Sequence, residues 1–199
     1  MPIIVNKEEK VKEICNKAFD EFTEHGIENF SLNQFIHNNQ ISKGQFYHYF
    51  KTKEDLIFEV MSQKTVEMIE RVELLLNDSN SLINKLFSVF AIYIDDSEEI
   101  SHLRKLMFDT FDLYMHTSNP KVKEFDQELY TWIDEKLVSL FVEANQQKPL
   151  SDGIFQIVKS ISATADGMYI RSLLVSEYDL KSELMNYLCE IEKLIDGAL

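Results

Sequence analysis

Glycine and proline are scarce in this chain, which holds five glycines and three prolines among its 199 residues. Average proteins contain these residues at about 7% and 5%. Hairpin turns and the glycine-rich loops of dinucleotide-binding folds depend on them, so the sequence leaves little room for either. Apolar residues instead recur every three or four positions, as in Ile14, Ala18 and Phe22, which is the spacing of one helix face. We therefore expect an all-α fold.

Polar caps and breaker residues predict the helix boundaries. A residue of capping type precedes each of the first four helices, and Glu, Gln or Asp follows three positions later. Gly26 supplies a left-handed stop for the first helix. The expected caps are Asn6, Ser31, Ser42 and Thr52. The expected helices span about 6–25, 31–38, 42–50, 52–76, 81–94, 98–116, 120–146, 151–177 and 179–197.

The sequence argues against membrane insertion and secretion. Its longest stretch without charged or strongly polar side chains, apart from a serine, is Leu86–Ile94, far short of the roughly 20 residues that span a bilayer. The N-terminus lacks the basic and apolar regions of a signal peptide. Cys15 and Cys189 lie on apolar helix faces far apart in the chain, which suits reduced, buried thiols. We expect a cytoplasmic protein without a disulfide.

Enzyme motifs are missing from the sequence. We find no HExxH, CxxC, P-loop or GxSxG pattern, and the five histidines are not spaced as a metal-binding set. We therefore expect no catalytic activity, no cofactor and no metal.

Acidic residues are unevenly distributed. Residues 1–64 contain 8 lysines and 10 acids, whereas residues 65–199 contain 12 basic and 24 acidic residues. The segment Asn29–Lys53 contains no acid at all. Phosphate binding needs clustered basic groups without repelling acids, so this segment is a plausible DNA-reading surface on an acidic chain. Chance could also produce 25 acid-free residues, so charge alone does not decide between the two.

The first three expected helices have the lengths and the tight turn of a helix-turn-helix, whose third helix enters the major groove. The segment Ser42–Leu56 has the residue types that this role requires. Phe46 and Phe50 are four positions apart and can pack inward, while Gly44 permits close approach of the backbone to DNA. The side chains expected to project outward are Lys43, Gln45, Tyr47 and His48.

Residues 7–60, and Ser42–Leu56 most closely, resemble the DNA-binding signature of the TetR family of bacterial transcription regulators. The resemblance implies a helix-turn-helix domain at residues 1–53 and a larger helical ligand-binding and dimerisation domain at residues 54–199. It also implies a homodimer that binds a palindromic operator and releases it when a small molecule binds. The turn before the third helix departs from the family pattern, because Asn39-Gln40-Ile41 stands where a turn glycine is common and Ile36 where a small residue is common. Either Gln40 or Asn39 could take the left-handed conformation there.

DNA contacts are expected from helices two and three and from the start of helix four. Lys43 could reach a phosphate or a guanine edge, or remain a solvated lysine. Gln45 could read a base or fold back onto the Ser42 cap. Lys53 is unfavourable at a helix start, which a phosphate partner would explain. The expected DNA-binding residues are Ser31, Asn33, Ser42, Lys43, Gln45, Tyr47, His48 and Lys53.

The remaining helices are rich in aromatic residues and methionines, which are core at most positions and could line a cavity at others. Few polar groups lie among them, so we expect a hydrophobic or amphipathic effector. Arg171 stands out in an apolar helix, although an ion pair with one of the many acids would also explain it. The expected ligand-binding residues are His102, Phe108, Phe111, Tyr114, Trp132, Tyr169 and Arg171.

Broad apolar faces on the last two expected helices predict a dimer interface, with an ordinary buried helix as the alternative. The expected interface residues are Ile161, Ala165, Leu184, Leu188, Ile191 and Ile195. Together these features predict a TetR-like repressor. Its rivals are an activator, a regulator without a ligand, and a helical protein-interaction module that has lost DNA binding.

Overall fold

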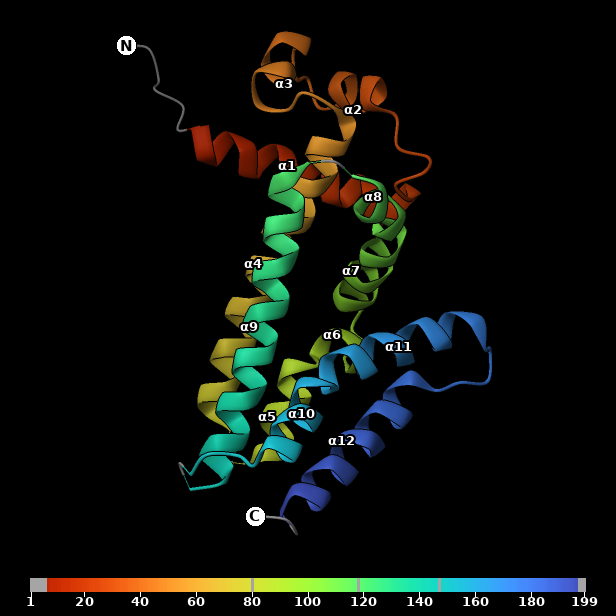
Figure 1. Cartoon of the computed structure of the whole chain (residues 1–199). Coiled ribbons are helices and arrows are strands. Elements are labelled where there is room, and N and C mark those ends of the chain that lie inside the picture. The colour runs from red at the N-terminus through yellow and green to blue at the C-terminus, as the bar shows by residue number, and fades with distance from the viewer. Residues whose placement is uncertain (1–6, 80, 118, 147, 197–199) are drawn as a thin grey trace. The chain divides into compact units, whose positions relative to one another are not determined.

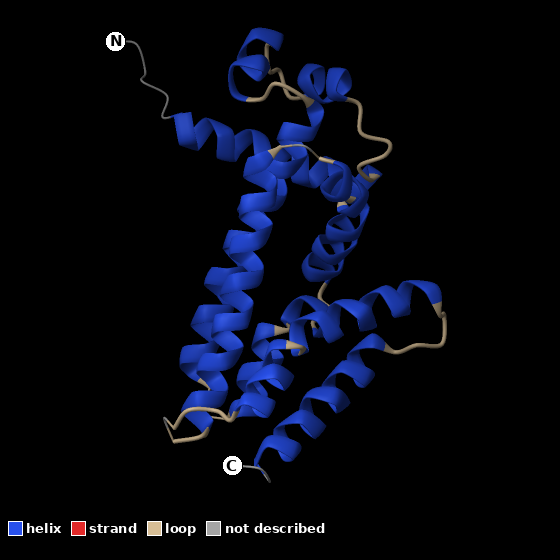
Figure 2. Ribbon diagram, in the orientation of Figure 1, coloured by secondary structure: helices blue, strands red, loops and turns tan. Residues whose placement is uncertain are grey.

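A computed structural model describes residues 7–79, 81–117, 119–146 and 148–196, with the side chains of residues 112, 195 and 196 also left out. All regular structure in these residues is helical, as expected (Figures 1 and 2). The helices are α1 (Lys7–His25), α2 (Leu32–Asn38), α3 (Lys43–Tyr49), α4 (Lys53–Asp78), α5 (Leu82–Val89), α6 (Ala91–Ile94), α7 (Glu98–Asp109), α8 (Phe111–His116), α9 (Pro120–Ala144), α10 (Asp152–Lys159), α11 (Ile161–Leu174) and α12 (Leu180–Asp196).

Three of the expected helices are each broken once, at Phe90, Thr110 and Ser160. Thr110 is fully buried, and its hydroxyl donates to the carbonyls of two residues in the preceding turn, Leu106 and Met107, at 3.0 and 2.9 Å. The hydroxyl of Ser160 donates in the same way to the carbonyl of Ile157, at 2.7 Å. Such back-bonding competes with regular helical hydrogen bonds and often bends helices, but Thr131 and Thr164 form the same bond within unbroken helices.

The helices form two compact units, Met1–Ile69 with His102–Lys123 and Glu70–Ser101 with Glu124–Leu199. The core of the first unit combines aromatic residues of α1 to α4 with buried residues of α7, such as Leu103 and Leu106. The Phe22 and Phe30 rings meet edge-on with centroids 4.7 Å apart, and Phe30 also packs against Phe35 at 5.3 Å. Gly26 has φ +78°, which confirms it as the left-handed stop of α1. The expected cap at Asn6 lies outside the described residues.

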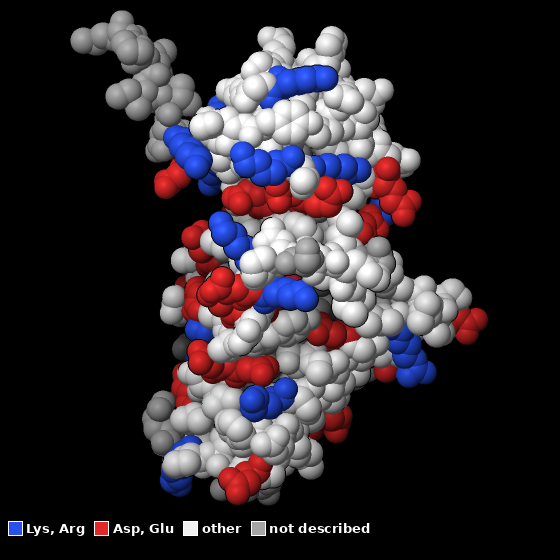
Figure 3. All heavy atoms as spheres, turned by 45° about the horizontal axis from the view of Figure 1, so that its top comes forward, with Lys and Arg blue, Asp and Glu red and all other residues white. Residues whose placement is uncertain are grey.

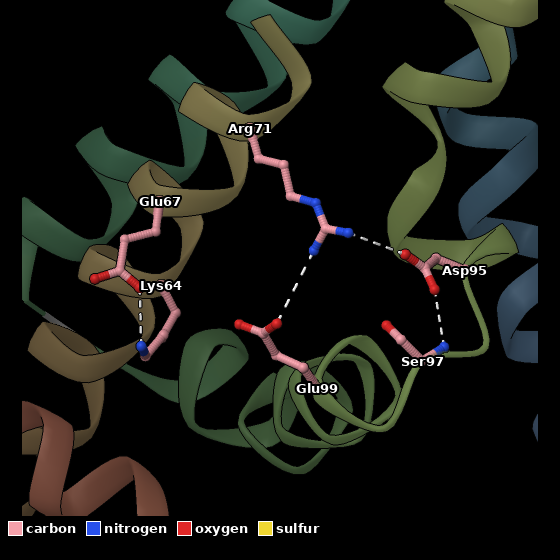
Figure 4. A network of polar contacts seen from close by, with 6 residues as sticks. All are labelled: Lys64, Glu67, Arg71, Asp95, Ser97 and Glu99. Carbon is pink, nitrogen blue, oxygen red and sulfur yellow. Dashed lines mark hydrogen bonds and ion pairs between the residues drawn. The ribbon is translucent and has the colours of Figure 1, made fainter. Parts of the chain in front are cut away.

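In the second unit, α12 packs against α5, α6 and α11. Its core contains fully buried apolar side chains, among them Leu86, Leu137, Phe141, Ile161, Leu184 and Leu188. Ion pairs tie its surface together. In Figure 4, Arg71 of α4 reaches Asp95 and Glu99 at 3.4 and 4.0 Å, and the backbone N–H of Ser97 donates to Asp95 at 2.8 Å. That backbone hydrogen bond is the main reason why the pKa of Asp95 lies below its ordinary value.

A tyrosine–carboxylate cluster joins α6, α9 and α11 within this unit. The hydroxyls of Tyr93 and Tyr130 donate to the two oxygens of Asp166, at 2.5 and 3.1 Å. Burial raises the pKa of Tyr130 to about 12 and that of the nearby Asp126 to about 6. Asp166 thus links three helices through hydrogen bonds to neutral phenols.

Both cysteines are free, and Cys15 is buried. Burial raises the pKa of its thiol to about 12, so the thiolate form that reacts with oxidants is suppressed. Among the described helices, none has the length and apolarity needed to cross a membrane.

Candidate nucleic-acid interface

Helix α3 has one buried and one exposed face. The hydroxyl of Ser42, at its N-cap, accepts the backbone N–H of Gln45 at 3.0 Å, as the sequence predicts. Phe46 is fully buried, and its ring centroid lies 5.4 Å from that of Phe50, which is also buried. These two rings anchor α3 and fix which of its side chains face solvent.

The opposite face of α3 is exposed. Lys43, Gly44, Tyr47 and His48 all lie on it, and Tyr47 keeps 48% of its surface. The exposed ring carries a hydroxyl, which can donate a hydrogen bond to a phosphate. In Figure 3 the part of the surface formed by α2 and α3 shows basic side chains among uncharged ones, in keeping with the acid-free segment around them.

Gln45 contributes its main chain to the cap of α3, not its side chain. The bond to Ser42 starts from the backbone N–H, and the half-buried side chain of Gln45 forms no hydrogen bond within the described part of the chain. Of the two interpretations of Gln45, capping by its side chain is therefore wrong, and base reading stays a prediction.

The turn between α2 and α3 is closed by Gln40 in the left-handed conformation, with φ +54°. Asn39 has φ −91°, so the alternative placement at Asn39 is wrong. The side-chain amide of Asn39 instead donates to the carbonyl of Phe35 at 3.0 Å. A non-glycine residue in this conformation carries backbone strain of roughly 1–2 kcal/mol.

At the start of α2, Ser31 is half-buried at the N-cap, but its side chain makes no capping bond. Ser31 therefore occupies the predicted N-cap position, but the predicted capping hydrogen bond from its side chain is wrong. Asn33 is exposed on α2. The predicted phosphate contact of Ser31 and the DNA contact of Asn33 stay predictions.

Helix α4 begins with the expected reciprocal cap. The Thr52 hydroxyl accepts the N–H of Asp55 at 3.0 Å, and the Asp55 carboxylate accepts the N–H groups of Thr52 and Lys51 at 3.1 and 2.9 Å. Lys53, in the first turn of α4, is half-buried. Its ammonium donates to the carbonyls of Ile27 and Phe30, each at 3.0 Å.

The expected ligand-binding residues are divided between the two units. His102, Phe108, Phe111 and Tyr114 belong to the first, whereas Trp132, Tyr169 and Arg171 belong to the second. Tyr169 is buried and its ring centroid lies 5.5 Å from that of Tyr93. Arg171 is exposed, and its guanidinium stacks over the Tyr178 ring at 4.9 Å. The expected ion pair of Arg171 with an acid is replaced by this stacking contact.

An open groove of about 470 Å³ lies along α9 and α10 in the second unit. None of the expected ligand-binding residues lines it. Polar, charged and apolar side chains line the groove. They are Thr131, Asp134, Glu135, Val138, Ser139, Val142, Phe155 and Lys159.

The expected dimer residues are core residues of the chain itself. Ile161, Ala165, Leu184, Leu188 and Ile191 are at most 9% exposed, so they retain little surface for a partner. The side chain of Ile195 lies outside the described residues. A different stripe is exposed along α10 and α11, with spacings of three and four residues. It consists of Phe155, Lys159, Ala163, Gly167, Ile170 and Leu174. The sequence indicates Ala163 and Gly167 as small residues that permit close helix approach, but the large apolar members of the stripe were not predicted.

In the part of the chain that the structure describes, no three His, Cys, Asp or Glu side chains are grouped so that they could hold a metal ion.

Comparison with known proteins gives consistent results. Residues 14–60 match the family model described as bacterial regulatory proteins, tetR family. An HTH-type transcriptional regulator of Staphylococcus aureus is 24% identical over 202 residues, which cover 95% of this chain and 96% of that protein.

Solved structures share the fold over nearly the whole chain. A protein from Saccharomonospora viridis in complex with choline matches with a TM-score of 0.75 and 14% identity, over 94% of this chain and 97% of that one. The fatty acid degradation regulator FadR from Bacillus halodurans matches with a TM-score of 0.64 and 18% identity, over 98% of each chain.

Proposed function

Because the chain belongs to the TetR family of bacterial transcription regulators, we propose that it is a homodimeric repressor that binds a palindromic operator and leaves it when a small molecule binds. Such a repressor acts in the cytoplasm, where chromosomal DNA lies. The single observation that carries the DNA-binding role is the exposed face of α3, with Lys43, Tyr47 and His48 held outward by the buried Phe46.

In this proposal, phosphate and base contacts are divided along the helix-turn-helix. Tyr47 and His48 donate to phosphates, while Lys43 contacts a phosphate or a guanine edge. Gln45, Ser42, Ser31 and Asn33 complete the DNA-facing set. Two copies of α3 in a symmetric dimer would enter successive major grooves, roughly 34–36 Å apart.

The proposed dimer uses the exposed stripe of α10 and α11. Ile170 and Leu174 keep 45% and 79% of their surface in the single chain, and both are large and apolar. Ala163 and Gly167 precede them on the same face and permit close helix approach. A two-fold axis through this stripe would place it against its own copy, as closed symmetric dimers require.

The proposed effector is a small hydrophobic or amphipathic molecule. Aromatic residues of the second unit supply apolar contacts, and the proteins of known structure with this fold include one bound to choline and one that regulates fatty acid degradation. An effector that lowers the affinity for DNA tenfold needs about 1.4 kcal/mol of coupling free energy between the DNA and ligand sites. DNA must then lower the affinity for the effector by the same factor.

The proposed function is tested by selecting duplexes from random-sequence DNA with the wild-type protein, and then titrating the selected duplex with and without candidate effectors. Choline and a medium-chain fatty acid are the first two probes. A palindromic selected sequence and tenfold weaker binding with one probe support the proposal. Selection of no sequence contradicts DNA binding, and binding that neither probe changes contradicts control by these two classes.

A further inference from the structure

Lys53, in the first turn of α4, directs its ammonium onto the turn between α1 and α2. Nζ donates to the carbonyl oxygens of Ile27 and Phe30, each at 3.0 Å, across 26 and 23 positions of the chain. The ammonium also lies 5.4 Å from the centroid of the Phe30 ring. These contacts fasten the start of α4 to the segment that leads into α2.

The segment held by Lys53 controls where α2 begins. Phe30 is buried between Phe22 and Phe35, and Ser31 follows it directly as the N-cap of α2. Since the side chain of Ser31 makes no capping bond, the entry to α2 depends on the residues before it. The Phe30 ring fixes that entry on one side, and Lys53 fixes the Phe30 carbonyl.

The same contacts explain why a lysine is tolerated at this position. A cation in the first turn of a helix opposes the helix dipole. Two carbonyl oxygens and an aromatic face compensate for this cost, so a phosphate partner is not needed to explain Lys53.

We infer that Lys53 is a positioning residue for DNA binding, which holds the start of α2 against α4 and thereby sets how α2 and α3 meet DNA. This inference rests on the proposed function, because it takes DNA as the ligand. A displacement of the first turn of α4 is passed through Lys53 to α2.

The test separates positioning from a direct phosphate contact by the salt dependence of binding. Lys53→Met keeps a long apolar stem over Phe30 but removes the charge and all donors, whereas Lys53→Arg can still donate to both carbonyls. The probe is the duplex that the wild-type protein selects from random-sequence DNA, titrated at several salt concentrations. Each lost phosphate contact lowers the slope of log affinity against log salt by about one unit.

Positioning predicts that Lys53→Met binds about tenfold more weakly with an unchanged salt slope, because preorganisation of α2 and α3 is lost. Lys53→Arg should restore most of the affinity. Backbone amides of Phe35 and Ile36 should exchange hydrogen faster in folded Lys53→Met than in the wild type. Lys43→Met is the control for a direct contact, and Lys148→Met, exposed in the second unit, is the control for the change in net charge.

A slope that falls by about one unit in Lys53→Met would identify a phosphate contact and overturn the inference. Unchanged affinity with an unchanged slope would overturn it as well. Thermal unfolding shows below which temperature each variant is folded, and DNA binding is measured below it. Lys53→Gln replaces Lys53→Met if the latter does not fold. If the wild-type protein selects no duplex, the proposed function fails and this inference with it. If the wild type binds and Lys53→Met binds equally well, only this inference fails.

Discussion

The hydroxyl of Ser42 accepts a hydrogen bond from the backbone N–H of Gln45 at 3.0 Å, and this bond caps α3 without using the Gln45 side chain. The two residues can therefore be separated by mutation. The Ser42 hydroxyl stabilises the recognition helix and also belongs to the proposed DNA-facing set, whereas the Gln45 side chain takes part only in the proposed DNA contact.

We expect Gln45→Ala to change base preference while leaving the free energy of unfolding within about 0.5 kcal/mol of the wild-type value, as for ordinary surface substitutions. Ser42→Ala should instead lower the free energy of unfolding by about 1 kcal/mol, because the N-cap acceptor is removed. Urea unfolding and selection from random DNA measure the two effects. Equal base preferences for Gln45→Ala and the wild type would contradict a reading role.

Gln40→Gly should stabilise the protein by about 1 kcal/mol, since glycine adopts the left-handed conformation without the strain that Gln40 carries at φ +54°. The gain is reduced by the greater freedom of glycine in the unfolded chain. Gln146 also has φ +54°, so Gln146→Gly is a matched test away from the helix-turn-helix. Gln34→Gly, in helix α2, should instead destabilise the protein by about 1 kcal/mol. Denaturant unfolding measures the free energy of unfolding of the three variants. A loss of stability in Gln40→Gly would contradict the backbone strain assigned to Gln40.

Asp126 should make stability depend on pH. Burial raises its folded-state pKa to about 6 from the ordinary value of 3.8, so the folded protein binds this proton more tightly than the unfolded chain. Its contribution to stability is fully present below about pH 4 and is lost as the pH rises through about 6. Asp126→Asn should therefore be more stable than the wild type at about pH 8, by roughly 1 kcal/mol after allowance for solvent screening.

The advantage of Asp126→Asn should disappear at about pH 4, where Asp126 of the folded wild type is already neutral. Comparing the two proteins at each pH cancels the titration of the many other acids. An advantage of equal size at both pH values would show that shape or hydrogen bonding, not charge, is responsible.

Ile170→Glu should give a folded monomer, because it places a charge in the proposed dimer face without touching the core. Leu188→Glu is the contrasting variant. Leu188 is fully buried within the chain, so the charge should cost several kcal/mol and unfold the protein. Light scattering at micromolar concentration and circular dichroism separate the outcomes. A dimeric Ile170→Glu would place the interface elsewhere.

Local chemistry made the N-terminal helices predictable from sequence. Ser42, Thr52 and Gly26 act on main-chain groups within a few residues, so α1, α3 and α4 begin or end where their caps indicate. The break at Thr110 could not be predicted from its hydroxyl, because Thr131 and Thr164 make the same bond to an earlier carbonyl within unbroken helices. The partners of Lys53 lie 23 and 26 positions earlier, beyond the reach of any helical spacing.

The apolar faces of the last helices show a different limit. A broad stripe of leucines predicts burial but does not say against what, and Leu184 and Leu188 are buried within their own chain. The sequence pattern could not distinguish these core residues from an interface. Exposure in the folded chain makes that distinction, and it favours the exposed Ile170 and Leu174 as interface residues.

The central claim, that this regulator reads DNA through the exposed face of α3, is tested most directly by titrating the selected duplex with wild-type protein and with Lys43→Ala across a range of salt concentrations. Lys43 is exposed on α3, so its loss should not unfold the protein. We expect weaker binding and a salt slope lower by about one unit for each lost phosphate contact, or an altered base preference if Lys43 contacts guanine. Unchanged affinity, salt slope and base preference would contradict the claim.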